Sequence, residues 1–295
     1  MKLGFYPGCS LEGASKEYNE SVVALAKKFG IELVSVPDWN CCGATAAHNL
    51  DKELSLALPA RNLALAEQAG ITEIVVPCAA CYSRFSVTHH ELMHDETLRT
   101  KINAATGMEY KGGLVILNVL QFIQKYILDK IEEKIVKPQT FKSACYYGCL
   151  LVRPNNILKF DRTEDPQIMD EVMKKIGSTP LDWAFKTECC GAGFSVSFTE
   201  TVARLSGKIV EDAAVRGADA IIVACPMCHS NLDMRRPEIN NYLGQKTTIP
   251  VIYITQALGL AVGINEKELG LQRHFVPVNI KYSAPVENSQ KKEVK

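Results

Sequence analysis

Ten cysteines recur in the same order in the two halves of the chain, and this duplication constrains the fold more than any other feature. Each half contains a single cysteine, then a Cys-Cys-Gly triplet, then a Cys-x-x-Cys pair, at similar spacing. Self-similarity on this scale indicates two copies of one structural unit. The cysteines are Cys9, Cys41, Cys42, Cys78 and Cys81 in the first half, and Cys149, Cys189, Cys190, Cys225 and Cys228 in the second.

The segments between these cysteines alternate between strand and helix patterns. Strands are predicted at 2–6, 31–36, 71–76, 141–146, 179–183 and 220–224, and helices at 14–29, 50–69, 166–176 and 199–216. Pro59 is a possible break in the second of these helices. The stretch 89–113 is interpreted as the connection between halves, followed by a helix at 117–133. The segment 115–121 also resembles 251–256.

Short apolar strands that alternate with helices predict an α/β fold with parallel sheets covered by helices. We expect two tandem Rossmann-like domains related by a pseudo-two-fold axis, at 1–135 and 136–285, with a polar, disordered tail at 286–295. Six cysteines directly follow predicted strands, and ligands of such sheets collect at the carboxyl ends of strands. Each cysteine set is therefore expected to converge at one sheet edge.

The chain has 11 cysteines, an odd number, and Lys plus Arg equals Asp plus Glu at 33 each. A formal net charge of zero argues against a basic nucleic-acid surface. Neither a signal peptide nor an apolar stretch long enough to cross a bilayer is visible, so we expect a soluble, cytoplasmic protein. Clustered cysteines in a reducing compartment favour metal binding or redox chemistry over structural disulfides.

Five cysteines per half exceed the four ligands of a structural zinc site or of an ordinary four-iron cubane. Adjacent cysteines such as Cys41 and Cys42 point in different directions, which suits two irons of one cluster better than one small ion. The pattern therefore predicts an iron–sulfur cluster in each half, with either a spare thiolate or an unusual cluster. Zinc in one half stays open as an alternative. The eleventh cysteine, Cys145, is interpreted as a buried non-ligand, with a replacement role left open.

Several other side chains near the cysteines are candidates for contact with substrate. Arg84 and Arg153 follow cluster cysteines and would suit an anionic substrate, as would the Arg235-Arg236 pair. His48 and His229 also lie near the motifs. The competing interpretation is a solvated surface charge for each arginine, and quiet packing or a supporting hydrogen bond for each histidine.

Two clusters would suit the opening of a disulfide, because that reaction needs two electrons and one cluster usually passes one. A duplicated fold could hold one sulfur of the disulfide against each cluster, since thiolates are soft ligands with affinity for iron. Two clusters in series would serve equally as an electron relay.

The paired patterns, together with the segment Gly148-Cys149-Leu150-Leu151-Val152-Arg153-Pro154, resemble the B subunits of methanogen heterodisulfide reductases over essentially the whole chain. The broader CCG family also includes components of thiol:fumarate reductase, of unusual succinate dehydrogenases, and of glycolate and lactate oxidation systems.

The resemblance implies a noncubane [4Fe-4S] cluster in each half, bound by its five cysteines, and reduction of the coenzyme M–coenzyme B disulfide (CoM-S-S-CoB) to two thiols in methanogenesis. It implies electrons from the small iron–sulfur C subunit of heterodisulfide reductase, fed by its FAD-containing A subunit, with a nickel–iron hydrogenase or formate dehydrogenase attached and electron bifurcation at the flavin. Sulfonate and phosphate groups of the substrate would then engage the arginines. The rival functions are an electron-transfer or catalytic component of a thiol:fumarate reductase or succinate dehydrogenase type of complex, and a zinc-stabilised interaction module.

Overall fold

The computed structural model describes residues 1–44 and 47–282, and it contains two four-stranded, all-parallel sheets. The strand order is β2-β1-β3-β4 in the first sheet and β6-β5-β7-β8 in the second. The two orders are equivalent, because each sheet places its first strand between its second and third. The α/β fold with two related sheets is therefore confirmed. The predicted tail at 286–295 lies outside the described residues.

The first sheet is formed by four short strands with apolar inner residues. They are β1 (Lys2–Phe5), β2 (Glu32–Ser35), β3 (Glu73–Val75) and β4 (Val115–Leu117). The helices between and after them are α1 (Gly8–Glu12), α2 (Lys16–Lys28), α3 (Ala47–Leu50), α4 (Lys52–Gln68), α5 (Ala79–His94), α6 (Glu96–Thr106) and α7 (Val119–Tyr126). Parallel strands require such crossover helices, which cover the faces of the sheet.

The second sheet repeats this plan. Its strands are β5 (Lys142–Tyr146), β6 (Thr179–Pro180), β7 (Ala220–Val223) and β8 (Val251–Tyr253). Its helices are α8 (Ile168–Lys175), α9 (Thr199–Val215), α10 (Pro226–His229), α11 (Arg236–Leu243) and α12 (Ile254–Ala261). All four residues of β7 are buried, as expected for a central strand covered on both faces.

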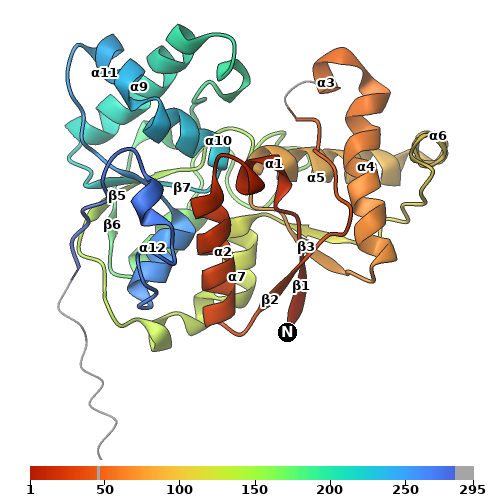
Figure 1. The fold of residues 1–295 in the computed structure, drawn as a ribbon, viewed down its shortest axis with the longest axis horizontal. Coiled ribbons are helices and arrows are strands. Elements are labelled where there is room, and N and C mark those ends of the chain that lie inside the picture. The colour runs from red at the N-terminus through yellow and green to blue at the C-terminus, as the bar shows by residue number, and fades with distance from the viewer. Residues whose placement is uncertain (45–46, 283–295) are drawn as a thin grey trace, which may run out of the picture.

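The two halves pack together through helices near the middle of the molecule. Helix α2 of the first half lies against α12 of the second, and α7 lies against α8 (Figure 1). Burial of apolar side chains from both halves forms one continuous core that includes Val22, Leu25, Leu258 and Ala261. The division at residue 135 remains a prediction, although each sheet lies wholly on one side of it.

Three expectations about the elements are wrong. The stretch 89–113 is not a simple connection, because it contains the end of α5 and all of α6. Helix α4 runs through Pro59, which is buried, without ending. The helix predicted at 117–133 ends at Tyr126 and gives way to 3₁₀ turns at Leu128–Lys130 and Glu132–Lys134.

The predicted similarity of 115–121 and 251–256 corresponds to a repeated structure. In both segments a three-residue strand leads directly into a helix, α7 or α12. The side chain of Gln121 accepts from the amide of Asn118, and Gln256 accepts from the amide of Tyr253 in the same way. Among the described residues, no helix combines the length and hydrophobicity needed to cross a bilayer.

Candidate iron–sulfur site

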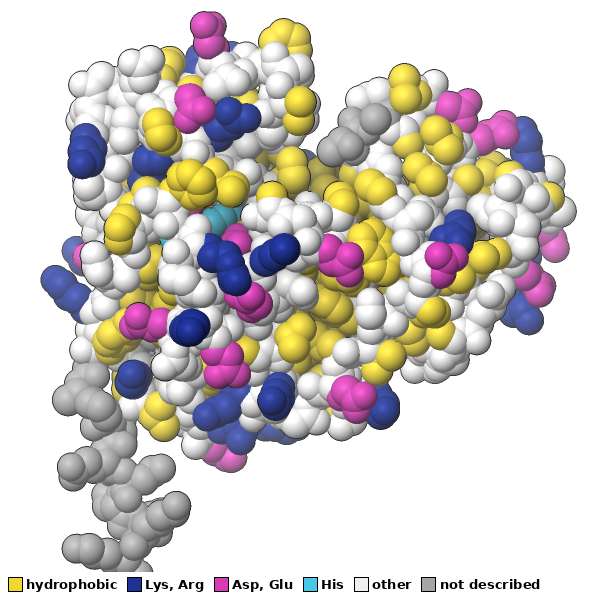
Figure 2. Space-filling view, in the orientation of Figure 1, with side chains coloured by type: hydrophobic (Ala, Val, Ile, Leu, Met, Phe, Trp, Pro, Cys, Tyr) yellow, Lys and Arg dark blue, Asp and Glu magenta, His cyan; other side chains and the backbone are white. Residues whose placement is uncertain are grey.

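The cysteines gather where the carboxyl ends of both sheets face each other. Cys9 lies in α1, Cys81 in α5 and Cys228 in α10, and each of these helices begins just after a sheet strand. Figure 1 places α1 and α10 close together near the centre, between an upper left lobe with α9 and α11 and an upper right lobe with α3 and α4. Figure 2 shows the surface hollowed between these two upper lobes, with hydrophobic side chains around the hollow.

The first cysteine set runs from solvent into the core. The sulfurs of Cys9 and Cys41, both exposed, lie 4.0 Å apart. Cys42 is buried, and its sulfur lies 3.1 Å from the sulfur of Cys81. Cys78 is also buried, at the N-cap of the helix that carries Cys81. All five predicted cysteines of the first half are therefore brought together.

The second set repeats this arrangement. Exposed Cys189 and half-buried Cys149 lie close enough to shift each other's pKa, and the buried sulfurs of Cys190 and Cys228 lie 3.7 Å apart. Cys228 also contacts Cys225. In both halves the single cysteine and the first cysteine of the triplet lie outward, whereas the second cysteine of the triplet meets the Cys-x-x-Cys pair inside.

The two sets meet in the core. Cys78 and Cys225 are the first cysteines of the two Cys-x-x-Cys pairs, and the carbonyls of the residues before them, Pro77 and Ala224, lie 3.4 Å and 3.1 Å from the same hydroxyl, that of Tyr18. Both cysteines are buried. The two cysteine sets consequently approach each other across the boundary between the halves.

Matching tyrosines and glycines shape the cysteine loops. The hydroxyl of Tyr6 donates to the carbonyl of Asn40 at 2.7 Å, and that of Tyr146 donates to the carbonyl of Glu188 at 2.6 Å, in each case just before the triplet. Gly148 has a φ of +69°, and a Cβ there would lie 2.9 Å from the sulfur of Cys228. Glycine is required at that position because the backbone passes so close to the sulfur of Cys228.

The pKa values of neighbouring thiols indicate that the cysteine sets would bind a cation. Hydrogen bonds from Cys41 and then Cys81 lower the pKa of Cys42 to about 4, whereas the contact with Cys42 raises the pKa of Cys41. Likewise the contact with Cys149 lowers the pKa of Cys189 to about 6. Each thiolate thus depends on a protonated neighbour. A bound cation would let both sulfurs of such a pair ionise together, which fits an iron–sulfur core.

The two candidate arginines lie near the cysteine sets. Arg84 is half-buried on α5, one turn beyond Cys81, and its charge adds to the hydrogen bonds from Cys41 and Cys81 that lower the pKa of Cys42. Arg153 is half-buried, pairs with Glu164 at 2.9 Å, and its carbonyl accepts a bond from Ser83 of α5 at 3.4 Å. Contact of either arginine with substrate remains a prediction.

The two candidate histidines lie in opposite environments. His48 is exposed on α3. His229 is buried; its Nε2 lies 3.2 Å from both the carbonyl of Val251 and Nδ1 of His274, and burial keeps its pKa well below the usual range. His229 is therefore held in the core rather than at the surface. Of the arginine pair, Arg236 is also buried and donates to the carbonyls of Leu232 and Ile249.

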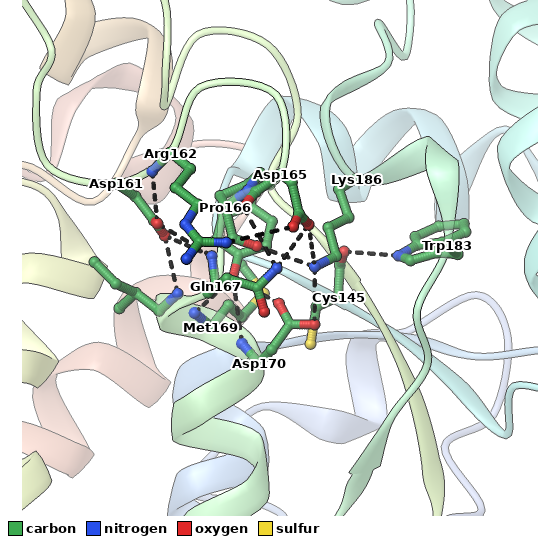
Figure 3. A network of polar contacts seen from close by, with 12 residues as sticks. Cys145, Asp161, Arg162, Asp165, Pro166, Gln167, Met169, Asp170, Trp183 and Lys186 are labelled. Atoms are coloured by element: carbon green, nitrogen blue, oxygen red, sulfur yellow. Dashed lines mark hydrogen bonds and ion pairs between the residues drawn. The ribbon is translucent and has the colours of Figure 1, made fainter.

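Cys145 is buried on β5 as predicted, and its surroundings are polar (Figure 3). Its carbonyl accepts a bond from the indole of Trp183 at 3.0 Å, and burial followed by the charge of Asp170 raises the pKa of its thiol. Asp170 pairs with buried Lys186 at 3.2 Å, and Lys186 also pairs with Asp165 at 2.9 Å. The carbonyl of Lys186 accepts from the amide of Gly148, so this network supports the loop that carries Cys149.

Sequence reasoning missed the side chains that support the sulfurs. Asn231 donates to the carbonyl of Cys190 at 3.1 Å, with its sulfur at 3.7 Å. The Tyr-x-Gly-Cys repeat at Tyr6 and Tyr146 was visible in the sequence, and it was the available signal for the paired hydroxyl contacts. No comparable signal marked Asn231, because the equivalent residue of the first half is Arg84.

Comparison with known proteins agrees with this arrangement. The family model described as a cysteine-rich domain, CCG, matches residues 3–86 and 143–233, which is one match in each half. A solved structure of a hypothetical protein from Helicobacter pylori superposes with a TM-score of 0.77 at 13% identity, over 94% of this chain and 52% of that one. The chain thus spans about half of that protein, and the likeness concerns the fold alone.

Curated relatives align along nearly their full length. The chain is 31% identical to the B subunit of the ferredoxin/F420H2-dependent CoB–CoM heterodisulfide reductase of Methanosarcina acetivorans, covering 97% of both chains. It is 30% identical to the 8-methylmenaquinol:fumarate reductase membrane anchor subunit of Wolinella succinogenes, over 93% of this chain and 97% of the relative. Two related sheets, two converging cysteine sets and these matches together show that the chain belongs to the CCG cysteine-rich family, among the relatives of the heterodisulfide reductase B subunits.

Proposed function

We propose that the protein is the catalytic subunit of a heterodisulfide reductase, which opens the coenzyme M–coenzyme B disulfide between two iron–sulfur clusters. The observation that carries the proposal is the close approach of the two Cys-x-x-Cys segments, because the carbonyls of Pro77 and Ala224, just before Cys78 and Cys225, both lie within 3.4 Å of one buried hydroxyl. Two independent metal sites would not need to be adjacent. A disulfide has two sulfurs a bond length apart, so its opening favours two electron sources that face the same small volume.

The ten motif cysteines would hold the clusters, five in each half, and both clusters would be of the noncubane [4Fe-4S] type. When bound, the clusters would supply the two electrons that opening a disulfide consumes. Exposed Cys9, Cys41 and Cys189 lie at the outer edge of the sets, so substrate would approach from the hollow between the upper lobes. Arg84, Arg153 and His48 are the available side chains for its anionic ends, whereas His229 would orient the loop after Cys228 from within.

The partners would be the iron–sulfur C subunit of heterodisulfide reductase as electron donor and its FAD-containing A subunit, together with a nickel–iron hydrogenase or a formate dehydrogenase. The support for partners is that the similar chains are themselves named as subunits of larger enzymes. In this setting the protein would act in methanogenesis with electron bifurcation at the flavin, in the cytoplasm.

The test combines metal analysis with spectroscopy on anaerobically purified protein. Iron, acid-labile sulfide and zinc are quantified, and paramagnetic resonance spectra are recorded before and after addition of coenzyme M and coenzyme B thiols. We expect about eight irons per chain, little zinc and a new signal with each thiol. A zinc-filled half, or spectra indifferent to both thiols, would overturn the disulfide mechanism.

Matched cysteine variants assign the clusters. Cys81→Ser and Cys228→Ser should each lose about half of the iron, because each removes a ligand from one set. Cys145→Ala is the control, since this cysteine lies on β5 outside both sets, and it should retain all of the iron. Loss of iron from Cys145→Ala would instead give that cysteine a ligand role.

A second candidate function follows from the relative in Wolinella succinogenes, which is as similar as the relative in Methanosarcina acetivorans and is named as part of a fumarate reductase. In that case the chain would transfer electrons to or from a quinol-linked complex. Spectra that respond to a quinol analogue but not to either thiol would favour it.

A further inference from the structure

One buried hydroxyl touches both Cys-x-x-Cys segments at once. Tyr18 of α2 is fully buried, and its hydroxyl lies 3.1 Å from the carbonyl of Ala224 and 3.4 Å from the carbonyl of Pro77. These two residues directly precede Cys225 and Cys78. The single hydroxyl proton is therefore shared between the backbones that carry the two central cysteines.

The ring of Tyr18 is held rigidly. It stacks on Tyr253 with ring centroids 4.0 Å apart and an interplanar angle of 4°, and His229 stacks on the other side of Tyr253 at 4.4 Å. The hydroxyl of Tyr253 contacts the carboxylate of Glu17 at 3.3 Å. This stack joins α2 of the first half to β8 and α10 of the second, so it spans the boundary between the halves.

The duplication provides no second residue of this kind. Helices α2 and α8 end at equivalent glycines, Gly30 and Gly177, and counting back the same distance from each places Asp165 opposite Tyr18. Asp165 precedes α8 and pairs with Lys186 instead (Figure 3). The contact to both cysteine segments thus depends on one side chain of the first half.

We propose that Tyr18 is a positioning residue that fixes the spacing between the two cluster sites. The inference rests on the proposed function, because it requires a cluster in each half. The hydroxyl ties the Pro77 and Ala224 carbonyls to one point, and so limits how far the segments of Cys78 and Cys225 can separate. Without it, each ligand set stays complete, but the two sets are no longer held at one distance.

The test is Tyr18→Phe, which keeps the stacked ring and removes only the shared hydroxyl. Iron content and the thermal midpoint are measured first, and then the magnetic interaction between the two reduced clusters by paramagnetic resonance. We expect unchanged iron and a weaker or broadened interaction, since magnetic coupling depends steeply on separation. A Tyr18→Phe protein that loads fewer irons than the wild type would overturn the proposal, because a spacing residue leaves each set intact.

Ser21→Ala is the matched control. Ser21 also links α2 to the second half, through a 2.7 Å hydrogen bond to Thr255, but it touches neither cysteine segment. It should leave the magnetic interaction unchanged. Equal effects of Ser21→Ala and Tyr18→Phe on the magnetic interaction would mean that any weakening of the contact between the halves changes it. That result would refute a specific role for Tyr18. If wild-type protein itself holds fewer than two clusters, the proposed function fails; if it holds two and Tyr18→Phe matches it, only this inference fails.

Discussion

The two halves share their cysteine geometry but differ in what supports it. In the second half, buried ionisable side chains surround the motif: Lys186, Asp170, His229, Asp233 and Arg236. Among the described residues of the first half, the buried charged side chain is Glu17, which faces Tyr253 of the second half. Even residues that directly follow the motifs differ, since Tyr82 matches His229, and Arg84 matches Asn231.

This difference shows which parts of the duplicated unit the cluster site constrains. The cysteines, the tyrosine hydroxyl before each triplet and the close glycine recur because they touch the ligand loops directly. The more distant supports have diverged, because a loop can be held equally by apolar packing or by a satisfied ion network. Two sites built alike can therefore differ in stability, acid sensitivity and potential.

The largest expected difference concerns the ion network of the second half. Lys186→Met leaves the buried carboxylate of Asp170 without its cation, which should cost about 3 to 5 kcal/mol of unfolding free energy. Urea denaturation followed by circular dichroism measures this loss. Lys101→Met, which breaks an exposed pair with Glu53, should cost less than about 1 kcal/mol. Similar losses of unfolding free energy in the two variants would mean that the buried ion network of the second half stabilises the protein no more than an exposed ion pair of the first half.

The next effect is a loss of stability in acid. Burial lowers the pKa of His274 to about 4 from its usual 6.5, so the unfolded chain binds more protons between these values. The contribution of His274 to the unfolding free energy should therefore be fully present above pH 6.5. It should fall by about 1 to 3 kcal/mol as the pH drops toward 4. Urea midpoints measured across this range test it. His274→Gln should weaken the dependence without abolishing it, because burial also lowers the pKa of His229, whereas His94→Gln, at an exposed position on α5, should leave it unchanged.

A third difference is electronic. Arg84 brings a positive charge near the first set, where the second set has neutral Asn231, so the first-half cluster should have the higher reduction potential. Arg84→Asn should lower that potential by about 40 to 90 mV, equivalent to an interaction of about 1 to 2 kcal/mol. Redox titration monitored by paramagnetic resonance measures it. Arg99→Asn, on the distant α6, is the control, and an equal shift there would indicate a general charge effect.

The smallest effect tests what the halves have in common. Tyr6→Phe and Tyr146→Phe each remove one hydroxyl that donates to the residue before a triplet, and each should cost about 1 kcal/mol. Urea denaturation of both variants should give losses that agree within error. A clear difference between the two losses of unfolding free energy would show that the tyrosine hydroxyl stabilises the two halves unequally.

The strands, the duplication and the convergence of the cysteines could be predicted from the sequence, because apolar runs and cysteine spacing are local signals. The course of α6 could not, since Ile102 is the residue that this helix buries, and one apolar position gives no periodic signal. The close approach of the Cys78 and Cys225 segments also escaped prediction, as it depends on how the halves pack. Tyr18 looked like an ordinary core residue of a helix, because nothing in its neighbourhood shows that its hydroxyl reaches 206 positions along the chain to Ala224.

The exposed outer edge of the first cysteine set determines how the protein must be handled. Once metal is lost, Cys9 and Cys41 present two solvent-accessible sulfurs only 4.0 Å apart, a separation that small side-chain rotations can close to a bond. Air would then convert them to a disulfide and trap the chain in a form that no longer accepts iron. Preparations made in air should consequently be two mass units lighter at this pair and should need a reductant before reconstitution.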